Sequence, residues 1–217
     1  MSDKFYMKFL VFEGLDGSGK SSLMAALEQE LQKRQIDFHR TREPGGTPLG
    51  DEIRNMILRT EGPSPLARAE LLLYEASRAQ HVDQVIRPKL QAGTWVLCDR
   101  FSASSIAFQS GGREISEKDV VMLNDFATGG LKADLTILLD LPVEESRRRR
   151  QGRGAANGES EDRIESEADT FHEKVRQSFL AQARADEKSW LVLDAKKTPQ
   201  ELFTLLLAAL AEKNILR

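Results

Sequence analysis

The stretch Gly14-Leu15-Asp16-Gly17-Ser18-Gly19-Lys20-Ser21 decides the fold of this chain. It matches the pattern G-x-x-x-x-G-K-[ST] at every required position, and it follows the apolar run KFLVFE at residues 8–13. Residues 19–34, which come next, carry apolar side chains at helical spacing. A strand, a Gly-rich turn and an amphipathic helix in this order predict a phosphate-binding loop rather than a chance Gly-rich turn.

The chemistry of this loop follows from its composition. Glycines let the backbone curl so that successive N–H groups face one anion, and the helix N-terminus adds a partial positive charge. Lys20 supplies a point charge for the β- and γ-phosphates of a nucleoside triphosphate, and Ser21 offers an oxygen to Mg²⁺. The nucleotide is expected to contact Gly14, Leu15, Asp16, Gly17, Ser18, Gly19, Lys20, Ser21 and Ser22. The loop alone leaves a kinase, an ATPase and a GTPase open, although the sequence lacks the N-K-x-D with which a GTPase reads its base.

Apolar runs and helical patterns alternate along the rest of the chain. Besides residues 8–13, strands are expected at residues 36–41, 94–98, 134–140 and 190–193. Helical periodicity marks residues 49–58, 65–91, 116–128, 168–187 and 199–213, and a further helix follows Pro142. This alternation predicts an α/β fold: a three-layer P-loop architecture in which helices cover both faces of a mostly parallel five-stranded sheet. Ligands of such folds bind beyond the carboxyl ends of the strands.

Length and composition limit the classes of protein to which this chain can belong. Its 217 residues, 40% hydrophobic and 30% charged, suit one globular domain, so we expect residues 1–217 to form a single domain. The 31 Lys and Arg against 34 Asp and Glu leave a net charge of −3, which favours neither nucleic acid nor an anionic membrane as a partner. A single Cys excludes an internal disulfide and a multi-Cys zinc site.

Neither a membrane span nor a secretion signal is expected. The longest apolar stretch, residues 202–211, is too short to cross a bilayer. The first residues lack the long apolar region and the small-residue cleavage site of a signal peptide. We therefore expect a cytoplasmic location.

Four further segments accompany the phosphate-binding loop, which reads FEGLDGSGKS at residues 12–21. They are REPGGT at 42–47, LLYEASRAQH at 72–81, DRF at 99–101 continuing to SSIAFQ at 104–109, and DRIE at 162–165. In this order and spacing the segments closely resemble the bacterial thymidylate kinase family, and the match extends over residues 9–179. The loop is generic, whereas the REPGGT and DRF segments are much more specific.

The resemblance implies the Mg²⁺-dependent reaction ATP + dTMP → ADP + dTDP, carried out by a homodimer. Phosphoryl transfer depends mostly on positioning and charge neutralisation, so cationic groups are needed on both sides of the transferred group. Two alternatives remain open: a kinase of another nucleoside monophosphate such as dUMP, and a nucleotide-binding module that catalyses no transfer. The acceptor-side residues named below argue against the second, because a simple triphosphate switch has no use for them.

Charged residues follow several of the predicted strands. Arg42 and Arg100 lie just past strand ends, where their guanidinium groups could clamp the acceptor phosphate, which is the role that the resemblance implies. A surface ion pair is the alternative for either one. Asp99 ends an apolar strand, the usual place for a carboxylate that holds the Mg²⁺ shell together with Ser21. A helix N-cap is the alternative for Asp99, and Asp140 competes for the same role because it also ends an apolar run.

The resemblance also assigns residues to the base and sugar of dTMP. Tyr74 and Arg78 are four residues apart on a predicted helix, so they lie on one face. By resemblance Tyr74 stacks on thymine and Arg78 bonds its carbonyl, although an ordinary core aromatic is the alternative for Tyr74. Ser104 and Gln109 could read the remaining base edge, and Phe108 would lie near the sugar.

One acid, Asp16, lies within the phosphate-binding loop, where the cradle for a triphosphate requires none. The resemblance implies that Asp16 orients the acceptor sugar and phosphate, and an Asx-turn is the alternative. The expected catalytic residues are Lys20, Asp16, Arg42, Arg100 and Arg153.

Residues 147–163 are expected to form a lid. Arg occupies positions 147–150, 153 and 163, and the Gly, Ala and Asn of residues 153–161 predict a mobile loop that closes over ATP. Positions 15–18 include no Arg, so the chain resembles members of the family that carry the catalytic Arg in the lid. Arg153 is expected to stabilise the transition-state charge and Arg149 to pack near the adenine. A nucleic-acid-binding patch is the alternative, but no aromatic residues are interleaved for stacking.

Overall fold

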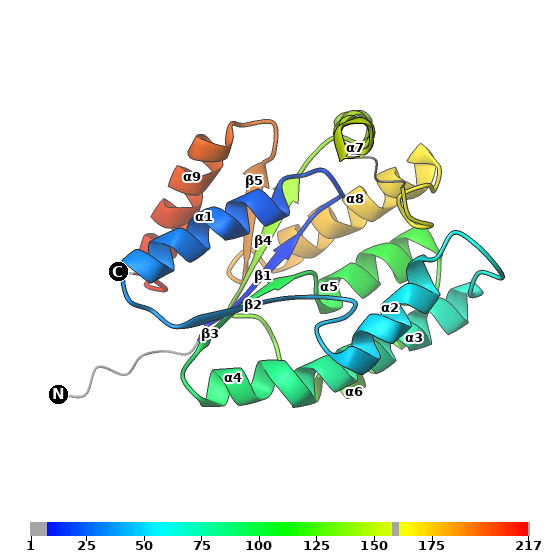
Figure 1. Cartoon of the computed structure of the whole chain (residues 1–217), viewed down its shortest axis with the longest axis horizontal. Helices are drawn as coiled ribbons and strands as arrows, with labels where there is room; N and C mark the ends of the chain where they lie inside the picture. The colour runs from blue at the N-terminus through cyan, green and yellow to red at the C-terminus, as the bar shows by residue number, and fades with distance from the viewer. Residues whose placement is uncertain (1–7, 158–160, 217) are drawn as a thin grey trace.

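The computed structural model describes residues 8–157 and 161–216, with the side chains of residues 153–157 left undescribed. Its centre is a five-stranded sheet in the order β2-β3-β1-β4-β5 (Figure 1). The strands are β1 (Phe9–Glu13), β2 (Phe38–Arg42), β3 (Trp95–Asp99), β4 (Leu135–Asp140) and β5 (Trp190–Asp194). Every pairing between them is parallel, which confirms the predicted sheet.

Helices cover both faces of this sheet. In chain order they are α1 (Lys20–Lys33), α2 (Pro48–Leu58), α3 (Ala67–His81), the π-helix η1 (Val82–Ile86), α4 (Arg87–Gln91), α5 (Ser102–Ser105), the π-helix η2 (Ile106–Gly112), α6 (Glu117–Thr128), α7 (Val143–Asn157), α8 (Asp169–Ala185) and α9 (Pro199–Glu212). In Figure 1, α1 and α9 lie on one side of the strands, and α3, α4, α6 and α8 lie on the other. The three-layer architecture is therefore confirmed.

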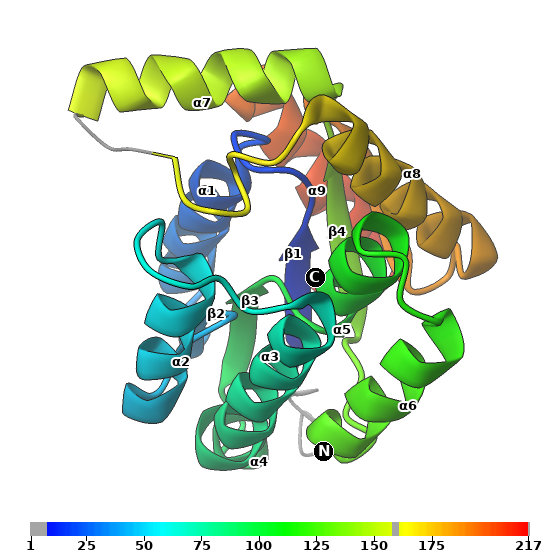
Figure 2. The same ribbon diagram turned by 90° about the vertical axis from the view of Figure 1, so that its right-hand side faces the viewer.

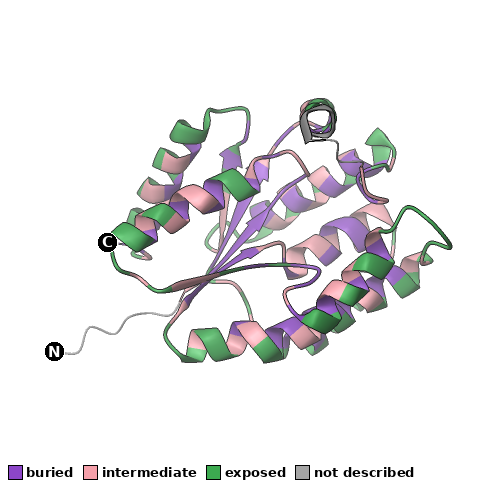
Figure 3. Ribbon diagram, viewed as in Figure 1, coloured by how far each residue is buried: buried purple, intermediate pink, exposed green. Residues whose placement is uncertain are grey.

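The alternation of side chains along β1 explains how both faces are filled. Leu10 and Phe12 pack in a cluster with apolar residues of α1 and α9, whereas Phe9 and Val11 pack with η1 and β3 on the opposite face. All five residues of β1 are buried, as Figure 3 shows for the centre of the sheet. A strand buried on both faces favours apolar residues, which is why FLVF at residues 9–12 is a continuous apolar run, and Glu13 at its end is the exception.

Two expectations about helices are refined by the structure. Residues 67–91 form α3, η1 and α4 in direct succession. Pro88 lies in the first turn of α4, directly after the π-helix η1. The loop expected over residues 153–161 is wrong for residues 153–157, because α7 continues to Asn157. The Arg and the two Ala of this segment favour a helix, and their preference outweighs the cost of its one Gly.

None of the described helices is long and apolar enough to cross a membrane.

Candidate active site

The phosphate-binding loop connects β1 to α1, as predicted. Gly14, Gly17 and Gly19 have φ angles of 132°, 77° and 97°, which side chains other than Gly rarely adopt. A Cβ at Gly14 would also come within 2.5 Å of the Leu139 carbonyl oxygen of β4. The side chain of Lys20 donates to the carbonyls of Gly14 and Leu15 at 3.1 and 3.2 Å, so it lies inside the curve of the loop.

A cavity of about 630 Å³ opens in front of this loop. It is lined by Asp16, Gly17, Gly19, Lys20, Ser21, Ser22, Arg42, Glu43, Arg54, Asp99, Arg100, Arg149, Asp162 and Glu165. The cations and the acid that the sequence placed at strand ends thus meet the loop at the carboxyl edge of the sheet. We refer to this space as the phosphate cavity.

The metal side of the phosphate cavity is suited to Mg²⁺. Asp99 Oδ1 is buried and has no hydrogen-bond partner among the described residues, and Ser21 lines the same cavity. An unpartnered buried carboxylate oxygen is costly unless a cation or a donor approaches it. Asp140, the competing residue, is paired with Arg176 at 2.7 and 2.9 Å. The donor set therefore fits an ion held by Asp99 and Ser21, with the remaining positions left to water and phosphate oxygens.

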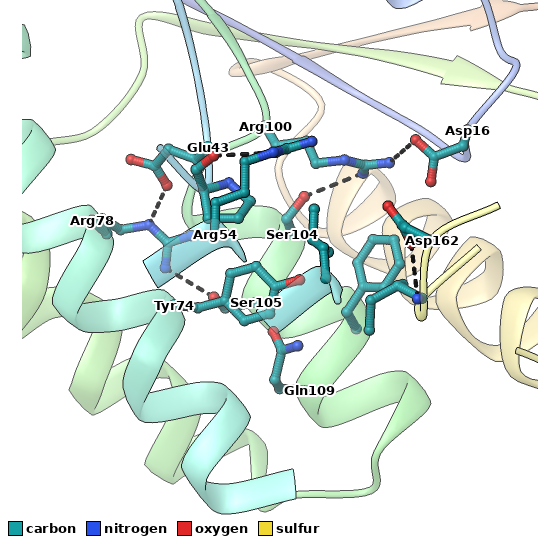
Figure 4. Close-up of a pocket in the computed structure, with 14 residues that line it drawn as sticks. Asp16, Glu43, Arg54, Tyr74, Arg78, Arg100, Ser104, Ser105, Gln109 and Asp162 are labelled. Atoms are coloured by element: carbon teal, nitrogen blue, oxygen red, sulfur yellow. Dashed lines mark hydrogen bonds and ion pairs between the residues drawn. The ribbon is translucent and has the colours of Figure 1, made fainter. Parts of the chain in front are cut away.

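A second cavity, the acceptor cavity, adjoins the first on the side of α3 and η2 (Figure 4). It is lined by Asp16, Glu43, Pro44, Arg54, Leu58, Tyr74, Arg78, Arg100, Ser104, Ser105, Phe108, Gln109, Asp162 and Ile164. All the residues expected at the base and sugar of dTMP are in this set. Of the expected acceptor-side residues only Arg42 is not, because it lines the phosphate cavity instead.

Arg100 and Asp16 form the bridge between the two cavities. Arg100 Nη2 donates to Asp16 Oδ1 at 2.8 Å, and the Arg100 guanidinium lies 5.0 Å from the centre of the Phe108 ring. Burial alone would raise the pKa of Asp16, but the charges of Arg100 and Lys20 hold that pKa well below its usual range. Asp16 is therefore an anion held in place by two cations, at the wall that both cavities share.

Arg78 is buried, and its guanidinium is engaged with the protein itself. Its Nε donates to Glu43 at 2.7 Å, and its Nη1 donates to Glu75 at the same distance. The remaining acceptors are Ser105, Asn124 and the Phe101 carbonyl. These contacts give Arg78 a structural role in addition to its place on the wall of the acceptor cavity. The predicted bond from Arg78 to the thymine carbonyl stays a prediction.

The other expected base-side residues are also held by neighbours. The Ser104 hydroxyl donates to Glu13 at 2.7 Å, and the Gln109 amide donates to Glu70 at 3.0 Å. Tyr74 projects from α3 toward the space beside Arg78 and Ser105 (Figure 4). Because several polar groups are already paired, the acceptor cavity presents fixed rather than freely rotating donors and acceptors.

Sequence reasoning missed several residues of this site, three of which line both cavities: Arg54, Glu43 and Asp162. Arg54 donates to the Pro44 carbonyl at 3.1 Å, and Asp162 accepts the backbone N–H groups of Ile164 and Glu165. Glu43 and Asp162 belong to the REPGGT and DRIE segments, which could have identified them. Arg54 lies within α2 with no motif around it, so only the packing of α2 against the loop after β2 reveals its position.

Helix α7, which contains the first part of the segment expected to form a lid, lies across the carboxyl edge of the sheet beside the phosphate-binding loop (Figure 2). Arg149 donates to the Gly17 carbonyl at 3.4 Å and to Glu145 at 2.8 Å. The Ser146 hydroxyl donates to the Asp16 carbonyl at 2.7 Å, which fastens the same helix to the loop. Arg153, the expected transition-state residue, has a side chain outside the described residues.

A phosphate-binding loop on a parallel sheet, with a cation-lined acceptor cavity that shares its wall, defines the class of the P-loop nucleotide kinases. The family model for thymidylate kinase matches residues 12–205 of this chain. The chain belongs to the thymidylate kinase family.

Curated relatives agree with this assignment over nearly the whole chain. A thymidylate kinase from Bdellovibrio bacteriovorus is 79% identical over 210 residues, which cover 97% of this chain and 98% of the relative. Thymidylate kinases from Desulfovibrio desulfuricans and Geotalea daltonii are each 43% identical, over 89% and 86% of this chain and 90% and 88% of their own lengths.

Proposed function

We propose that this protein transfers the γ-phosphoryl group of ATP to dTMP, giving ADP and dTDP for dTTP synthesis. The single observation that carries the proposal is the shared wall between the two cavities. Both cavities are lined by Asp16, Glu43, Arg54, Arg100 and Asp162. An acceptor phosphate at this wall would lie directly beside a triphosphate held by the loop, which is the arrangement that in-line transfer needs.

The charges around the wall suit the transition state. Lys20 neutralises the donor phosphates, while Arg42 and Arg100 bind the acceptor phosphate and draw the two anions together. Mg²⁺, held by Ser21 and Asp99, would supply further neutralisation of the β- and γ-oxygens. Asp16 keeps Arg100 in place at 2.8 Å and orients the acceptor sugar.

The base of dTMP occupies the inner part of the acceptor cavity in this proposal. The Tyr74 ring offers a flat apolar face for thymine, and Phe108 lies toward the sugar. Arg78, Ser104 and Gln109 supply the polar edge of the cavity. Their own hydrogen bonds fix their orientation, so a base with a different pattern of donors would leave buried groups unpaired.

The lid completes the donor side. In the proposal, Arg153 reaches the transferred phosphoryl group when the segment of residues 147–163 closes, and Arg149 packs near the adenine. Its contact with the Gly17 carbonyl places Arg149 beside the loop that holds the phosphates. Residues 1–217 then act as one domain with a lid.

We further propose that the protein is a cytoplasmic homodimer. Helices α2, α3 and α6 leave large apolar side chains exposed: Met56, Leu72, Met122 and Phe126. Phe126 is 86% exposed, which is unusual for a Phe unless another chain covers it. Light scattering should give twice the chain mass of 24.3 kDa for the wild type. The Phe126→Asp variant should give the mass of one chain, as a monomer. A monomeric wild type would contradict the dimer.

An assay of ADP release across a panel of nucleoside monophosphates tests the reaction itself. ATP and Mg²⁺ are supplied with dTMP, dUMP, dCMP, dGMP or AMP, and we expect the highest kcat/KM for dTMP. The absence of ADP above background with dTMP would refute the proposal. A preference for dUMP would instead support a kinase with another acceptor, and no transfer to any acceptor would support a non-catalytic module.

A further inference from the structure

Glu13 is a buried acidic residue next to the phosphate-binding loop, and it has no assigned role in the reaction proposed above. It is the last residue of β1, and its side chain is fully buried. The described residues that line the phosphate and acceptor cavities do not include it. A buried carboxylate is costly unless its contacts compensate for the loss of water, so the contacts of Glu13 indicate what it does.

Among the described residues, the hydrogen-bond and ion-pair partners of this carboxylate belong to the segment that follows β3. Glu13 Oε1 accepts the backbone N–H of Phe101 at 2.9 Å, and Oε2 accepts the Ser104 hydroxyl at 2.7 Å. Arg100 Nη1 lies 3.8 Å from Oε2. One side chain therefore holds the backbone, a hydroxyl and a guanidinium of the same short segment.

This segment needs to be held, because its backbone conformation is unfavourable. Arg100 has a φ of 70°, in the left-handed region that a residue with a long side chain rarely adopts. The Arg100 N–H donates to the Phe12 carbonyl at 2.9 Å, and the next N–H, that of Phe101, donates to Glu13. Two consecutive N–H groups are thus fixed by two consecutive residues of β1. The left-handed turn is what carries the Arg100 side chain from the end of β3 toward Asp16.

Electrostatics agree with a role that depends on Arg100. Burial raises the pKa of Glu13 to about 7, and the charge of Arg100 is the foremost influence that lowers it, ahead of the Ser104 and Phe101 hydrogen bonds. Lys20 lowers the same pKa to a smaller extent. Because its pKa is raised, the charge of Glu13 adds little to the stability of the folded protein. What the Glu13 carboxylate provides is its contact with Arg100.

We propose that Glu13 is a positioning residue: it holds the left-handed turn and the guanidinium of Arg100 in the orientation that binds the acceptor phosphate. The inference rests on the proposed function, since it assumes that Arg100 meets the phosphate of dTMP. Glu13 itself touches neither nucleotide. Its loss should therefore weaken acceptor binding through Arg100 and leave donor binding nearly unchanged.

Asp140 provides a matched control. It ends β4, the other neighbour of β1, and it also pairs with an Arg, but its partner Arg176 belongs to α8. Glu13→Gln and Asp140→Asn each replace a strand-end carboxylate by an amide of the same shape. Isothermal titration of dTMP and, separately, of ADP into each variant measures the two affinities. We expect Glu13→Gln to lower the affinity for dTMP about tenfold, as the loss of a charged contact would. The affinity for ADP should change less than about twofold. Asp140→Asn should change neither.

A double-mutant cycle separates positioning from a general structural effect. In an Arg100→Ala background, Glu13→Gln should weaken dTMP binding by no more than about twofold, since the group that it positions is gone. An equal loss in both backgrounds would overturn the inference, and so would unchanged dTMP binding by Glu13→Gln. Thermal melting checks that each variant is folded. If Glu13→Gln does not fold, Glu13→Asp replaces it in the experiment. Glu13→Asp keeps the negative charge on a shorter side chain, so a smaller loss of dTMP affinity is expected. Failure of the wild type to bind dTMP would instead refute the proposed function.

Discussion

Replacement of Arg78 by Ala should destabilise this protein far more than replacement of Arg42, although both residues are expected on the acceptor side. Arg78 is 1% exposed and neutralises Glu43 and Glu75, which are buried beside it. The Ala variant leaves these two nearly buried carboxylates without the Arg78 cation. Arg42 has 57% of its side chain exposed and pairs with the half-exposed Asp51 at 3.3 Å.

The magnitudes follow from these two environments. Removal of one partner from a buried ion pair costs about 3–5 kcal/mol, so Arg78→Ala should lower the free energy of unfolding by about that amount. For a protein of this length about 1 kcal/mol shifts the Tm by about 2–4 °C, which gives a fall of about 6–20 °C. An exposed pair contributes about 0–1 kcal/mol, so Arg42→Ala should shift the Tm by no more than about 4 °C.

Urea unfolding followed by circular dichroism, with the m-value compared between variants, measures both effects. Arg78→Lys keeps a positive charge and should recover part of the loss. A decrease below about 1 kcal/mol for Arg78→Ala, or equal decreases for the Arg78 and Arg42 variants, would refute the reasoning, since either result would mean that Glu43 and Glu75 do not depend on the Arg78 guanidinium.

Three further predictions concern the metal, the lid and pH. Asp99→Asn should raise the Mg²⁺ concentration needed for half-maximal activity by about 10–100-fold, whereas Asp140→Asn should not; equal Mg²⁺ requirements would contradict the metal site. Arg153→Ala should lower kcat by at least about tenfold and change dTMP affinity much less, as measured by steady-state kinetics and titration; an unchanged kcat would assign the role to another Arg of the lid. Because the pKa of Glu13 is raised from 4.5 to about 7 in the folded protein, the folded state binds more protons than the unfolded state between these values. The contribution of Glu13 to stability therefore falls as pH rises from about 4.5 to about 7. The free energy of unfolding, measured with urea at pH 5 and pH 8, should fall less between these pH values for Glu13→Gln than for the wild type. An equal fall in the free energy of unfolding would contradict the raised pKa.

The strands and the phosphate-binding loop could be predicted because their signals are local. Residues 9–12 are apolar throughout, since β1 is buried on both faces, and the Gly pattern of residues 14–19 is required by the backbone angles of the loop. The strand-end rule correctly placed Arg42, Asp99 and Arg100 beside this loop. Each of these inferences needs only the order of residues along one element and the direction of a parallel sheet.

Other features depend on which groups the fold brings together, and local patterns missed them. The Gly and Asn of residues 153–157 predict a loop, but the helix-forming Arg and Ala beside them continue α7 through this segment. Arg54 was missed because a single Arg within an amphipathic helix carries no signal of its own. Glu13 was visible as the acid of the FEG segment, but its partners Phe101 and Ser104 belong to the segment that follows the neighbouring strand β3, about 90 residues later in the chain.

The sequence by itself determined the sheet, the phosphate-binding loop and the family, because these depend on periodicity, backbone conformation and motif spacing. Only the tertiary structure decided how the charges are used. Asp99 keeps a buried oxygen that has no hydrogen-bond partner in the described part of the chain, whereas Asp140 is paired with Arg176. Arg78 is paired with buried carboxylates, whereas Arg42 stays exposed. The physical reason is that the role of an ionisable side chain depends on burial and on its partners, and both arise from residues distant in the chain.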